Sequence, residues 1–441
     1  MDIMIAGAGT VGYSLAQTLS HKHNVIVVDK ETQTLNRLDD DIDVMTLLGD
    51  IEDPQTFQKS NIGSLDLFIA VTDSDEANLL STLIIDDVMH VKKKIIRLKN
   101  AYFEKGAVLT KLAVDEAVFP DDLTAQKVSA LFDFPKANNV KVFIHTEHKL
   151  ISVRVQNSEG LNYRVEDFTR DSVVVMGIER EKSFFVPKPT DAVLMNDLVY
   201  FFGSSEQIET MADKLNTQMP SSIKRVAIFG ANPLAQKIAK ALLHKNLEIK
   251  IIDKNRTYCK TASECLQDEV TVIHSAYEDH SLFEKAGLKN SDMIIAAGLD
   301  DEKNIVKCIE AKEYGIEKVV SINNDKSYYN LMHKLGIIVV RGSKAGAYYA
   351  ILEKIASSSI IAQRHYCGRK AVLFMRKINP NSPLIGKTLK TDKKQNRSLF
   401  LLREDTIHSC NDMLRLLEGD TVLISGKTEQ EDELKKWIYT L

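Results

Sequence analysis

Short apolar segments alternate with helical patterns through residues 1–135. The strand-like runs are DIMIA, NVIVV, DVMTLL, DLFIAV and KIIRL, and they are apolar almost throughout. Such runs suit parallel strands that are buried on both faces. After the first run, Val11, Leu15 and Leu19 recur every four residues and form one helical face. This alternation predicts an α/β fold with a Rossmann-like, doubly wound parallel sheet and right-handed crossovers.

In residues 136–217 the pattern of apolar and polar residues changes to an alternation with a period of two. The segments VKVFIHT and KLISVRV alternate apolar and polar positions, which is typical of antiparallel strands with one solvated face. We therefore expect a small α+β domain after the parallel sheet. The segment QMPSSIKR at 218–225 is typical of a linker, and AVLFMRKI at 371–378 is expected to open a second small domain.

The same plan occurs twice along the chain. Gly7 and Gly230 are 223 residues apart, and NDLVYFFGSSEQ (196–207) matches GDTVLISGKTEQ (419–430) at the same offset. Between them, FIAVTDSDEANLL (68–80) matches IIAAGLDDEKNIV (294–306) at an offset of 226. Any two α/β domains share a rhythm, but equal offsets at both ends of a long unit indicate a tandem duplication. The predicted domains of the first half are a nucleotide-binding Rossmann-like domain at 1–135 and a small α+β domain at 136–217. Those of the second half are a degenerate Rossmann-like domain at 223–360 and a second small α+β domain at 361–441.

Composition narrows the class of protein. Of the 441 residues 44% are hydrophobic and 27% are charged, as in a globular protein with a sizeable core. The net charge of −4 argues against general nucleic-acid binding, which uses a basic face. The five cysteines form no Cys-x-x-Cys pair, as expected of thiols in a reducing compartment. Apolar runs fall far short of the roughly 18 residues of a membrane span, so we expect a cytoplasmic protein.

The first helix follows a glycine-rich turn of the form Gly7-x-Gly9-x-x-Gly12. In a dinucleotide fold the first glycine permits the turn, the second lets a pyrophosphate approach the backbone, and the third allows close packing of helix and strand. The amides of Ala8, Gly9, Thr10, Val11 and Gly12 are then expected to face phosphate oxygens. The alternative is a glycine turn that serves packing alone.

Asp29 ends the next strand, 22 residues after Gly7. A carboxylate at this place accepts hydrogen bonds from ribose hydroxyls and repels a 2′-phosphate. The sequence therefore predicts NAD or NADH, or alternatively ATP or ADP, rather than NADP.

Further candidate residues stand at predicted strand ends, where doubly wound sheets bind ligands. Asp50 is either an adenine contact or a turn aspartate. Thr72 is expected to cap the following helix, with acidic residues three and four positions later; the alternative is that the amides of Thr72 and Asp73 face a ligand. Arg97 ends an apolar strand, where a guanidinium either faces the crevice and meets an anion or lies at a solvated strand end.

These residues resemble the N-domain of the regulator-of-potassium-conductance (RCK) family. The resemblance rests on the glycine turn, Asp29, Gly49-Asp50, AVTDSDEANLLSTLI and the RLKN that follows the fifth strand. The segments NDLVYFFG, PLIGKTL and EGDTVLISG resemble the matching C-domain. Two such units in one chain resemble the regulatory subunit of Trk-type potassium uptake, the TrkA family.

The resemblance implies a homo-oligomeric ring, expected to be a tetramer, that associates with the inner face of the cell membrane. Its partner would be a potassium channel or transporter subunit of Trk type, and a nucleotide would control their coupling. The family's site roles would fall on Gly7 to Gly12, Asp29, Asp50, Thr72, Asp73 and Arg97. Family members commonly carry Pro-Glu where this chain has Pro120-Asp121, which shortens a carboxylate that would otherwise reach the nucleotide or Arg97.

The second half departs from this pattern at its glycine turn. Gly230 is retained, but Asn232 and Ala235 replace the other two glycines, and Pro233 removes an amide. Alignment places Ser275-Ala276 against Gly49-Asp50 and Ser321 against Arg97, while Asp253 remains as a ribose acceptor. We expect no closely held nucleotide in this half, and whether the pocket of Asn232, Pro233, Leu234 and Asp253 binds another ligand stays open.

The sequence favours a sensor over an enzyme. Hydride transfer needs a substrate pocket with an acid or base facing the nicotinamide, and only some 80 residues follow before the pattern restarts. Neither His-x-x-x-His nor Gly-x-Ser-x-Gly occurs, so no catalytic residues and no metal site are predicted. The alternative function is an NAD-dependent oxidoreductase that uses the first Rossmann site.

Overall fold

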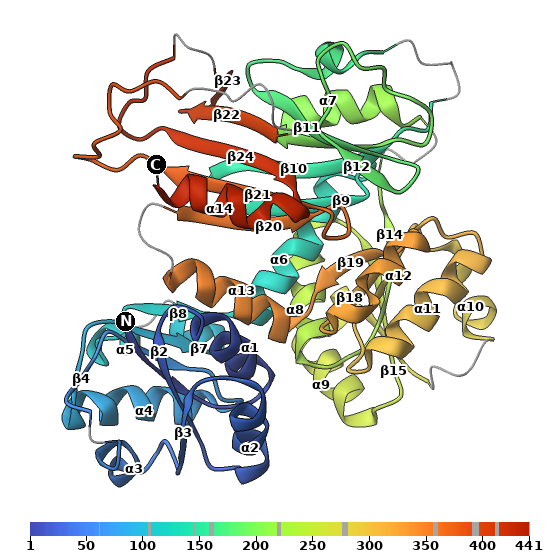
Figure 1. Ribbon diagram of the computed structural model, residues 1–441. Coiled ribbons are helices and arrows are strands. Elements are labelled where there is room, and N and C mark those ends of the chain that lie inside the picture. Colours follow the sequence, from blue (N-terminus) through green and yellow to red (C-terminus); the bar gives the residue numbers. More distant parts are fainter. Residues whose placement is uncertain are drawn as a thin grey trace. The chain divides into compact units, whose positions relative to one another are not determined.

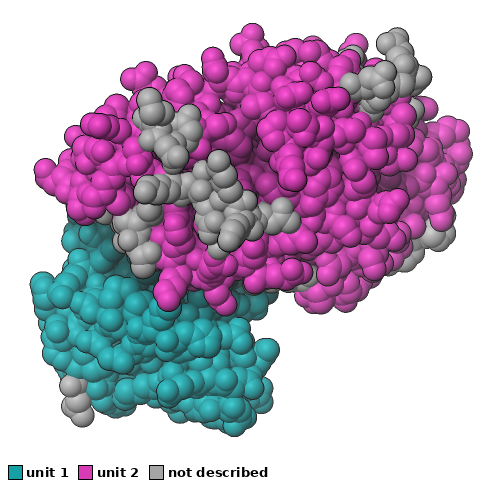
Figure 2. Space-filling model, turned by 45° about the horizontal axis from the view of Figure 1, so that its top comes forward, with its two compact units in different colours: residues 1–125, 341–355 teal, residues 126–340, 356–441 magenta. Residues whose placement is uncertain are grey.

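The computed structural model describes the chain apart from residues 61, 105–106, 144–145, 158–162, 218–221, 276–280, 356–359, 390–396, 411–413 and 441. Part of the expected linker at 218–225 and the aligned residue Ala276 therefore lie outside the described residues. The chain forms two compact units (Figure 2). Unit 1 comprises residues 1–125 and 341–355, and unit 2 comprises residues 126–340 and 356–441. A segment of the second half thus belongs to the unit built by the first half.

Unit 1 contains a six-stranded sheet in the order β3-β2-β1-β5-β7-β8. Figure 1 shows it in blue to cyan near the N-terminus. Its strands are β1 (Asp2–Ala6), β2 (Asn24–Asp29), β3 (Met45–Leu48), β5 (Leu67–Ala70), β7 (Lys94–Arg97) and β8 (Glu116–Val118). Neighbouring strands pair in parallel, with β1 between β2 and β5. A two-stranded parallel ladder of β4 (Ser64–Leu65) and β6 (His90–Val91) completes the strands of this unit.

Helices cover both faces of this sheet. They are α1 (Thr10–Leu19), α2 (Thr32–Asp41), α3 (Pro54–Gln58), α4 (Asp75–Val88), α5 (Val108–Lys111) and α13 (Ser343–Ile355). Ile3 and Ile5 point into a core with α1 and α2, whereas Met4 and Ala6 point into the core under α4. Each strand is therefore buried on both faces, which is why its sequence is apolar throughout.

Unit 2 contains a second sheet of the same plan, in the order β16-β15-β14-β17-β18-β19. Its strands are β14 (Arg225–Phe229), β15 (Glu248–Asp253), β16 (Thr271–His274), β17 (Met293–Ala296), β18 (Lys318–Asn323) and β19 (Ile338–Arg341). Its helices are α8 (Pro233–Leu242), α9 (Arg256–Leu266), α10 (Leu282–Lys285), α11 (Asp301–Glu313) and α12 (Tyr329–Lys334). The matching strand order supports the duplication that the sequence predicts.

Two small antiparallel sheets also belong to unit 2. The first has the order β12-β11-β13-β10-β9, with β9 (Asn139–Phe143), β10 (Thr146–Arg154), β11 (Val173–Arg180), β12 (Ser183–Phe185), β13 (Leu198–Gly203) and helix α7 (Ser205–Leu215). The second has the order β20-β21-β24-β22-β23, with β20 (Ile360–Tyr366), β21 (Ala371–Lys377), β22 (Arg397–Arg403), β23 (Thr406–Ser409), β24 (Thr421–Lys427) and helix α14 (Glu431–Thr440). The segment AVLFMRKI is thus the second strand of its sheet and not the first, because β20 precedes it.

The two small sheets share one hydrophobic core. Side chains from β11 and β13 pack with side chains from β20, β21 and β24. Both sheets also carry the same ion pair, between a partly exposed arginine and a buried aspartate. Arg180 bonds Asp197 through two nitrogens at 2.9 and 2.8 Å, and Arg403 bonds Asp420 in the same way at 2.9 Å for both contacts. These matching interactions, 223 positions apart, support the duplication down to single hydrogen bonds, and the predicted α/β fold class is confirmed.

Helices α6 (Pro120–Asp133) and α13 are equivalent in the two halves. The C-terminal end of each helix is contacted by a lysine from another part of the chain, half-buried in unit 1 and buried in unit 2. In unit 1, Lys93 donates to the carbonyl oxygen of Lys354 at the end of α13 at 2.7 Å. In unit 2, Lys318 donates to the carbonyl oxygens of Leu131, Phe134 and Pro135 at 2.8–3.1 Å. Burial lowers the pKa of Lys318 to about 7. A cation at a helix C-terminus is favoured by the helix dipole, so each lysine anchors the end of a helix that comes from the other half.

None of the helices in the described part of the chain combines the length and the apolar character that crossing a bilayer requires.

Candidate functional site

The turn between β1 and α1 requires two of its three glycines for its own geometry. Gly7 has a φ of +107°, which L side chains rarely adopt. A Cβ on Gly12 would lie 1.8 Å from the carbonyl oxygen of Gly7, so this glycine permits close packing of helix and strand. A Cβ on Gly9 would meet no atom within 4 Å. The described residues of unit 1 therefore do not require a glycine at this second position of the motif, and the open space beside Gly9 is available to a ligand.

Asp29, at the end of β2, holds this turn in place. Its Oδ2 accepts the N–H of Ala8 at 2.6 Å, and its Oδ1 accepts the N–H of Glu31 at 2.9 Å. Each carboxylate oxygen has two lone pairs, and the side chain is only half-buried, so Asp29 can still accept a ribose hydroxyl. The residue therefore has a structural role that the sequence did not reveal beside the binding role that it predicted.

A cavity of about 680 Å³ opens beside the glycine turn, and all of its lining residues belong to unit 1. It lies at the carboxyl ends of β1, β2, β5 and β7, where doubly wound sheets bind ligands. The predicted site residues that line it are Gly7, Gly9, Thr10, Val11, Asp29, Asp50, Thr72, Asp73 and Arg97. Ala8 and Gly12 do not line it. The N–H of Ala8 is bonded to Asp29, and Gly12 packs against the backbone of Gly7. Sequence reasoning missed Lys30, Gly49, Ile51, Glu52, Val28, Val71, Ser74, Ala77 and Lys344.

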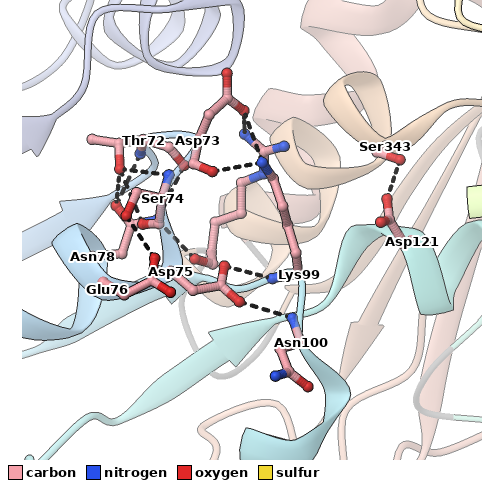
Figure 3. A network of polar contacts seen from close by, with 11 residues as sticks. Thr72, Asp73, Ser74, Asp75, Glu76, Asn78, Lys99, Asn100, Asp121 and Ser343 are labelled. Carbon is pink, nitrogen blue, oxygen red and sulfur yellow. Dashed lines mark hydrogen bonds and ion pairs between the residues drawn. The ribbon is translucent and has the colours of Figure 1, made fainter. Parts of the chain in front are cut away.

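Thr72 does not cap helix α4, contrary to the expectation from sequence. The N-cap is Ser74, whose Oγ accepts the N–H of Ala77 at 3.1 Å. Thr72 instead donates its N–H and its hydroxyl to Oδ1 of the buried Asn78, at 3.0 and 2.7 Å (Figure 3). Asn78 also donates to the carbonyl oxygen of Arg97 at 2.9 Å, so it joins the ends of β5 and β7. The helix begins later than the pattern suggested because the loop hydrogen bonds run through Asn78.

Arg97 is buried at the end of β7 and faces the cavity. Its Nη1 lies 3.1 Å from a carboxylate oxygen of the exposed Asp73, and its buried Nε has no hydrogen-bond partner among the described residues. Lys99 donates to the carbonyl oxygen of Asp73 at 2.5 Å. A buried guanidinium with an unused donor is suited to an anion, so the structure places Arg97 in the crevice and not at a solvated strand end.

Asp50 lies in the loop after β3 and also lines the cavity. Its Oδ1 accepts the N–H of Glu52 at 3.0 Å, which makes it a turn aspartate, and its side chain is exposed at the cavity. The two roles that the sequence offered for Asp50, a turn aspartate and an adenine contact, are therefore compatible with each other.

The geometry of this site can be compared with known proteins. The model of the TrkA-N domain family matches residues 3–120 and again residues 226–341, together more than half of the chain. The chain belongs to the TrkA family. Its first TrkA-N domain supplies all of the cavity lining except Lys344, and its second lies in unit 2 apart from its last residue.

Relatives and solved structures extend this likeness to the whole chain. The Trk system potassium uptake protein TrkA homolog 1 of Methanosarcina mazei is 24% identical, over 99% of this chain and 100% of that protein. The crystal structure of the GsuK RCK domain has a TM-score of 0.63 at 16% identity and covers 100% of this chain and 95% of that one. The GsuK channel bound to NAD (TM-score 0.62, 16% identity, 100% and 79% covered) and GsuK bound to ADP (0.52, 13%, 80% and 68%) share the fold.

The second TrkA-N domain fills its turn with its own side chain. Asn232 accepts the N–H of Ala235 at 3.1 Å and donates to the carbonyl oxygen of Ala297 at 2.6 Å. Asp253 is retained, but it is 93% buried, and its carboxylate oxygens accept the N–H groups of Ala231 and Asn255 at 2.7 and 2.8 Å. Because Asp253 repeats the structural role of Asp29, its presence is no evidence of a ribose site.

Hydrogen bonds also correct one alignment between the two domains. Asn78 donates to the carbonyl oxygen of Arg97, and its equivalent Asn304 donates to that of Ile322 at 2.9 Å. Arg97 therefore corresponds to Ile322 and not to Ser321. The second TrkA-N domain lacks the cation in either alignment, but the substitution by isoleucine shows that an apolar side chain fits this strand end.

The start of α6 brings the two halves together within unit 1. Asp121 accepts a hydrogen bond from the hydroxyl of Ser343, the first residue of α13 (Figure 3). Asp121 is thus engaged by α13. The next residue of that helix, Lys344, lines the cavity. No sequence signal points to it, because it lies 247 residues after Arg97 in a different repeat.

The charged groups that line the cavity are carboxylates, lysines and an arginine. Its lining, all within the described part of unit 1, includes no histidine, tyrosine or cysteine. The described residues also contain no group of three or more His, Cys, Asp and Glu side chains placed to hold a metal ion. The arrangement is suited to binding phosphates and hydroxyls.

Proposed function

We propose that this chain is a nucleotide-sensing regulatory subunit of a membrane potassium uptake system. The ligand would be NAD or NADH, or alternatively ATP or ADP, held in the cavity of the first TrkA-N domain. The observation that carries this proposal is the pairing of an open space at Gly9 with a buried, incompletely bonded guanidinium at Arg97. The names of the relatives, which refer to potassium uptake, and the NAD and ADP in the titles of two structures of the same fold support it.

The residues present fit such a ligand. The amides around Gly9 lie at the start of α1, a helix whose N-cap uses no side chain, so they are available to phosphate oxygens. Arg97 would add a cation, and Asp29 would accept ribose hydroxyls and disfavour a 2′-phosphate. Bound there, the nucleotide would act as a signal and not as a reagent, because the lining holds neither the histidine nor the tyrosine that would most readily serve as acid or base for hydride transfer. An oxidoreductase is the less favoured reading for that reason.

The partner would be a membrane potassium channel or transporter subunit of Trk type, with the chain on the cytoplasmic side. Two pairs of exposed apolar residues support assembly into a homo-oligomeric ring, for which we retain the tetramer. Leu80 and Leu83 on α4 are 41% and 53% exposed, and Val306 and Ile309, 226 positions later on α11, are 57% and 36% exposed. Exposed apolar residues at matching places in both repeats are suited to contacts between copies of the chain.

A ligand can act on the partner only through different affinities for two states of the assembly. A coupling free energy of roughly 1–3 kcal/mol would change the equilibrium between these two states about 5- to 150-fold.

Calorimetric titration with NAD, NADH, NADP, ATP and ADP tests the proposal. Wild type is compared with Arg97→Ile, a change for which Ile322 in the second TrkA-N domain provides a natural precedent. We expect at least one nucleotide other than NADP to bind, and Arg97→Ile to weaken that binding about tenfold or more, as expected for a lost charged hydrogen bond. Failure of all five ligands to bind, or equal binding of NADP and NAD, would contradict the proposal. A change in the absorbance of the nicotinamide that depends on an added substrate would favour the oxidoreductase.

A further inference from the structure

Helix α13 carries a side chain of the second half into the cavity of the first. The helix belongs to unit 1, while the chain before residue 341 and after residue 355 belongs to unit 2. Lys344 lies in its first turn and lines the cavity together with the glycine turn. A ligand in the first TrkA-N domain would therefore meet a cation that the second half of the chain supplies.

Several contacts fix the backbone of α13 against the rest of unit 1. Beside Lys344, the hydroxyl of Ser343 bonds Asp121, and the carbonyl oxygen of Arg341 accepts the hydroxyl of Thr124 at 3.1 Å. Further along the helix, the hydroxyls of Tyr348 and Thr18 lie 2.8 Å apart. The side chains that α13 buries in the core beside α1 are Ala347, Ala350 and Ile351. Lys344 is thus presented to the cavity from a fixed helix and not from a loose loop.

The charges around the cavity determine how much the cation of Lys344 contributes to binding of a phosphate ligand. The charged lining consists of four carboxylates and three cations: Asp29, Asp50, Glu52, Asp73, Lys30, Arg97 and Lys344. Arg97 is already paired with Asp73. A ligand with several phosphate charges would enter a wall that is negative on balance, and the exposed Lys344 would offset part of that repulsion. The effect of a single charge grows in proportion to the charge on the ligand.

We propose that Lys344 is a specificity-determining residue that favours nucleotides with a chain of terminal phosphates over dinucleotides. The proposal rests on the proposed function of the cavity as a nucleotide site. A nucleoside triphosphate carries several negative charges, whereas NAD carries its two phosphates internally and has a lower net charge. Because Lys344 is part of α13, binding of the more highly charged ligand is linked to the stability of that helix, and linkage requires the effect to be reciprocal.

The test measures binding of ATP, ADP and NAD by calorimetry to wild type and to Lys344→Gln. We expect the substitution to weaken ATP binding roughly three- to tenfold, ADP binding less, and NAD binding less than twofold, with the difference shrinking as salt increases. Lys344→Arg should restore the order of affinities. Lys59→Gln is the matched control, since Lys59 is an exposed lysine of unit 1 that does not line the cavity.

A second readout follows the helix itself. Saturating ATP should slow hydrogen exchange of the α13 amides in wild type and in Lys59→Gln, and should do so less in Lys344→Gln. The melting temperature without ligand checks that the variants are folded. If ATP binds wild type and Lys344→Gln equally, or if the variant loses ATP and NAD in equal proportion, the inference is wrong while the nucleotide site stands. If wild type binds none of the three, the proposed function itself fails and takes the inference with it.

Discussion

Alanine at two of the fingerprint glycines should produce opposite effects on stability and on binding. Gly9→Ala places a methyl group where no atom lies within 4 Å, at a residue with φ −62° and ψ −172°, which any residue adopts. Such a substitution changes stability by no more than about 1 kcal/mol, often upward, because it reduces the freedom of the unfolded chain. Gly12→Ala places the methyl group 1.8 Å from a backbone oxygen. Overpacking of this kind costs about 1–3 kcal/mol.

The assay is a thermal melt of each variant with and without nucleotide. For a unit of this size each kcal/mol moves the melting temperature by roughly 2–4 °C, so Gly12→Ala should melt about 2–12 °C lower and Gly9→Ala near wild type. A ligand at 100 times its dissociation constant adds about 2.7 kcal/mol to the stability of wild type. Gly9→Ala should lose most of that ligand-induced shift, because its methyl group would occupy the space that the phosphates need.

Two results would refute this reasoning. If Gly9→Ala kept the full ligand-induced shift, the open space at Gly9 would not be where the ligand binds. If Gly12→Ala melted like wild type, the turn of the first TrkA-N domain would be more adaptable than its geometry indicates. The second domain carries Ala235 at this position, within a turn that Asn232 rebuilds, so the prediction concerns the first domain alone.

Three further predictions concern the rest of the fold. Lys318→Met removes hydrogen bonds to three carbonyl oxygens in a buried site, and should lower the unfolding free energy of unit 2 by about 2–4 kcal/mol in a denaturant titration. Burial lowers the pKa of His148 below 6.5, so the unfolded state takes up its proton first and stability should fall as pH drops through about 6.5; His148→Phe should remove that part of the pH dependence in melts between pH 5 and 8. Leu83→Glu should reduce the oligomer mass in light scattering and leave the melting temperature of the subunit unchanged, because this side chain is exposed in the single chain.

The sequence predicted what depends on local pattern. Buried parallel strands need apolar runs, and tight turns need glycine, so β1, α1 and the place of Asp29 could be inferred from composition and spacing. The duplication was visible because both repeats retain the same order of such signals. Asp253 shows the limit of this approach, because its carboxylate is retained to hold a turn, which the pattern alone cannot distinguish from a ribose contact.

The remaining features depend on contacts between distant parts of the chain. Thr72 resembles a helix cap in sequence, but its hydrogen bonds go to Asn78, and only the fold reveals that partner. Lys344 reaches the first cavity because α13 packs in the core of unit 1, and apolar residues at helical spacing do not say which of two similar sheets they cover. For the same reason the pairing of Arg97 with Ile322 emerged from the hydrogen bonds of Asn78 and Asn304 and not from the offset between repeats.

Potassium flux through a Trk-type membrane subunit, reconstituted in vesicles with this protein, tests the central claim most directly. Flux is measured without nucleotide and with NAD, NADH, ATP or ADP, using wild type, Gly9→Ala and the control Lys59→Gln. We predict that at least one nucleotide changes the flux severalfold with wild type and with the control, that Gly9→Ala abolishes the response, and that the nucleotide is recovered chemically unchanged. A flux that no nucleotide alters, or a response that Gly9→Ala retains in full, would contradict the account.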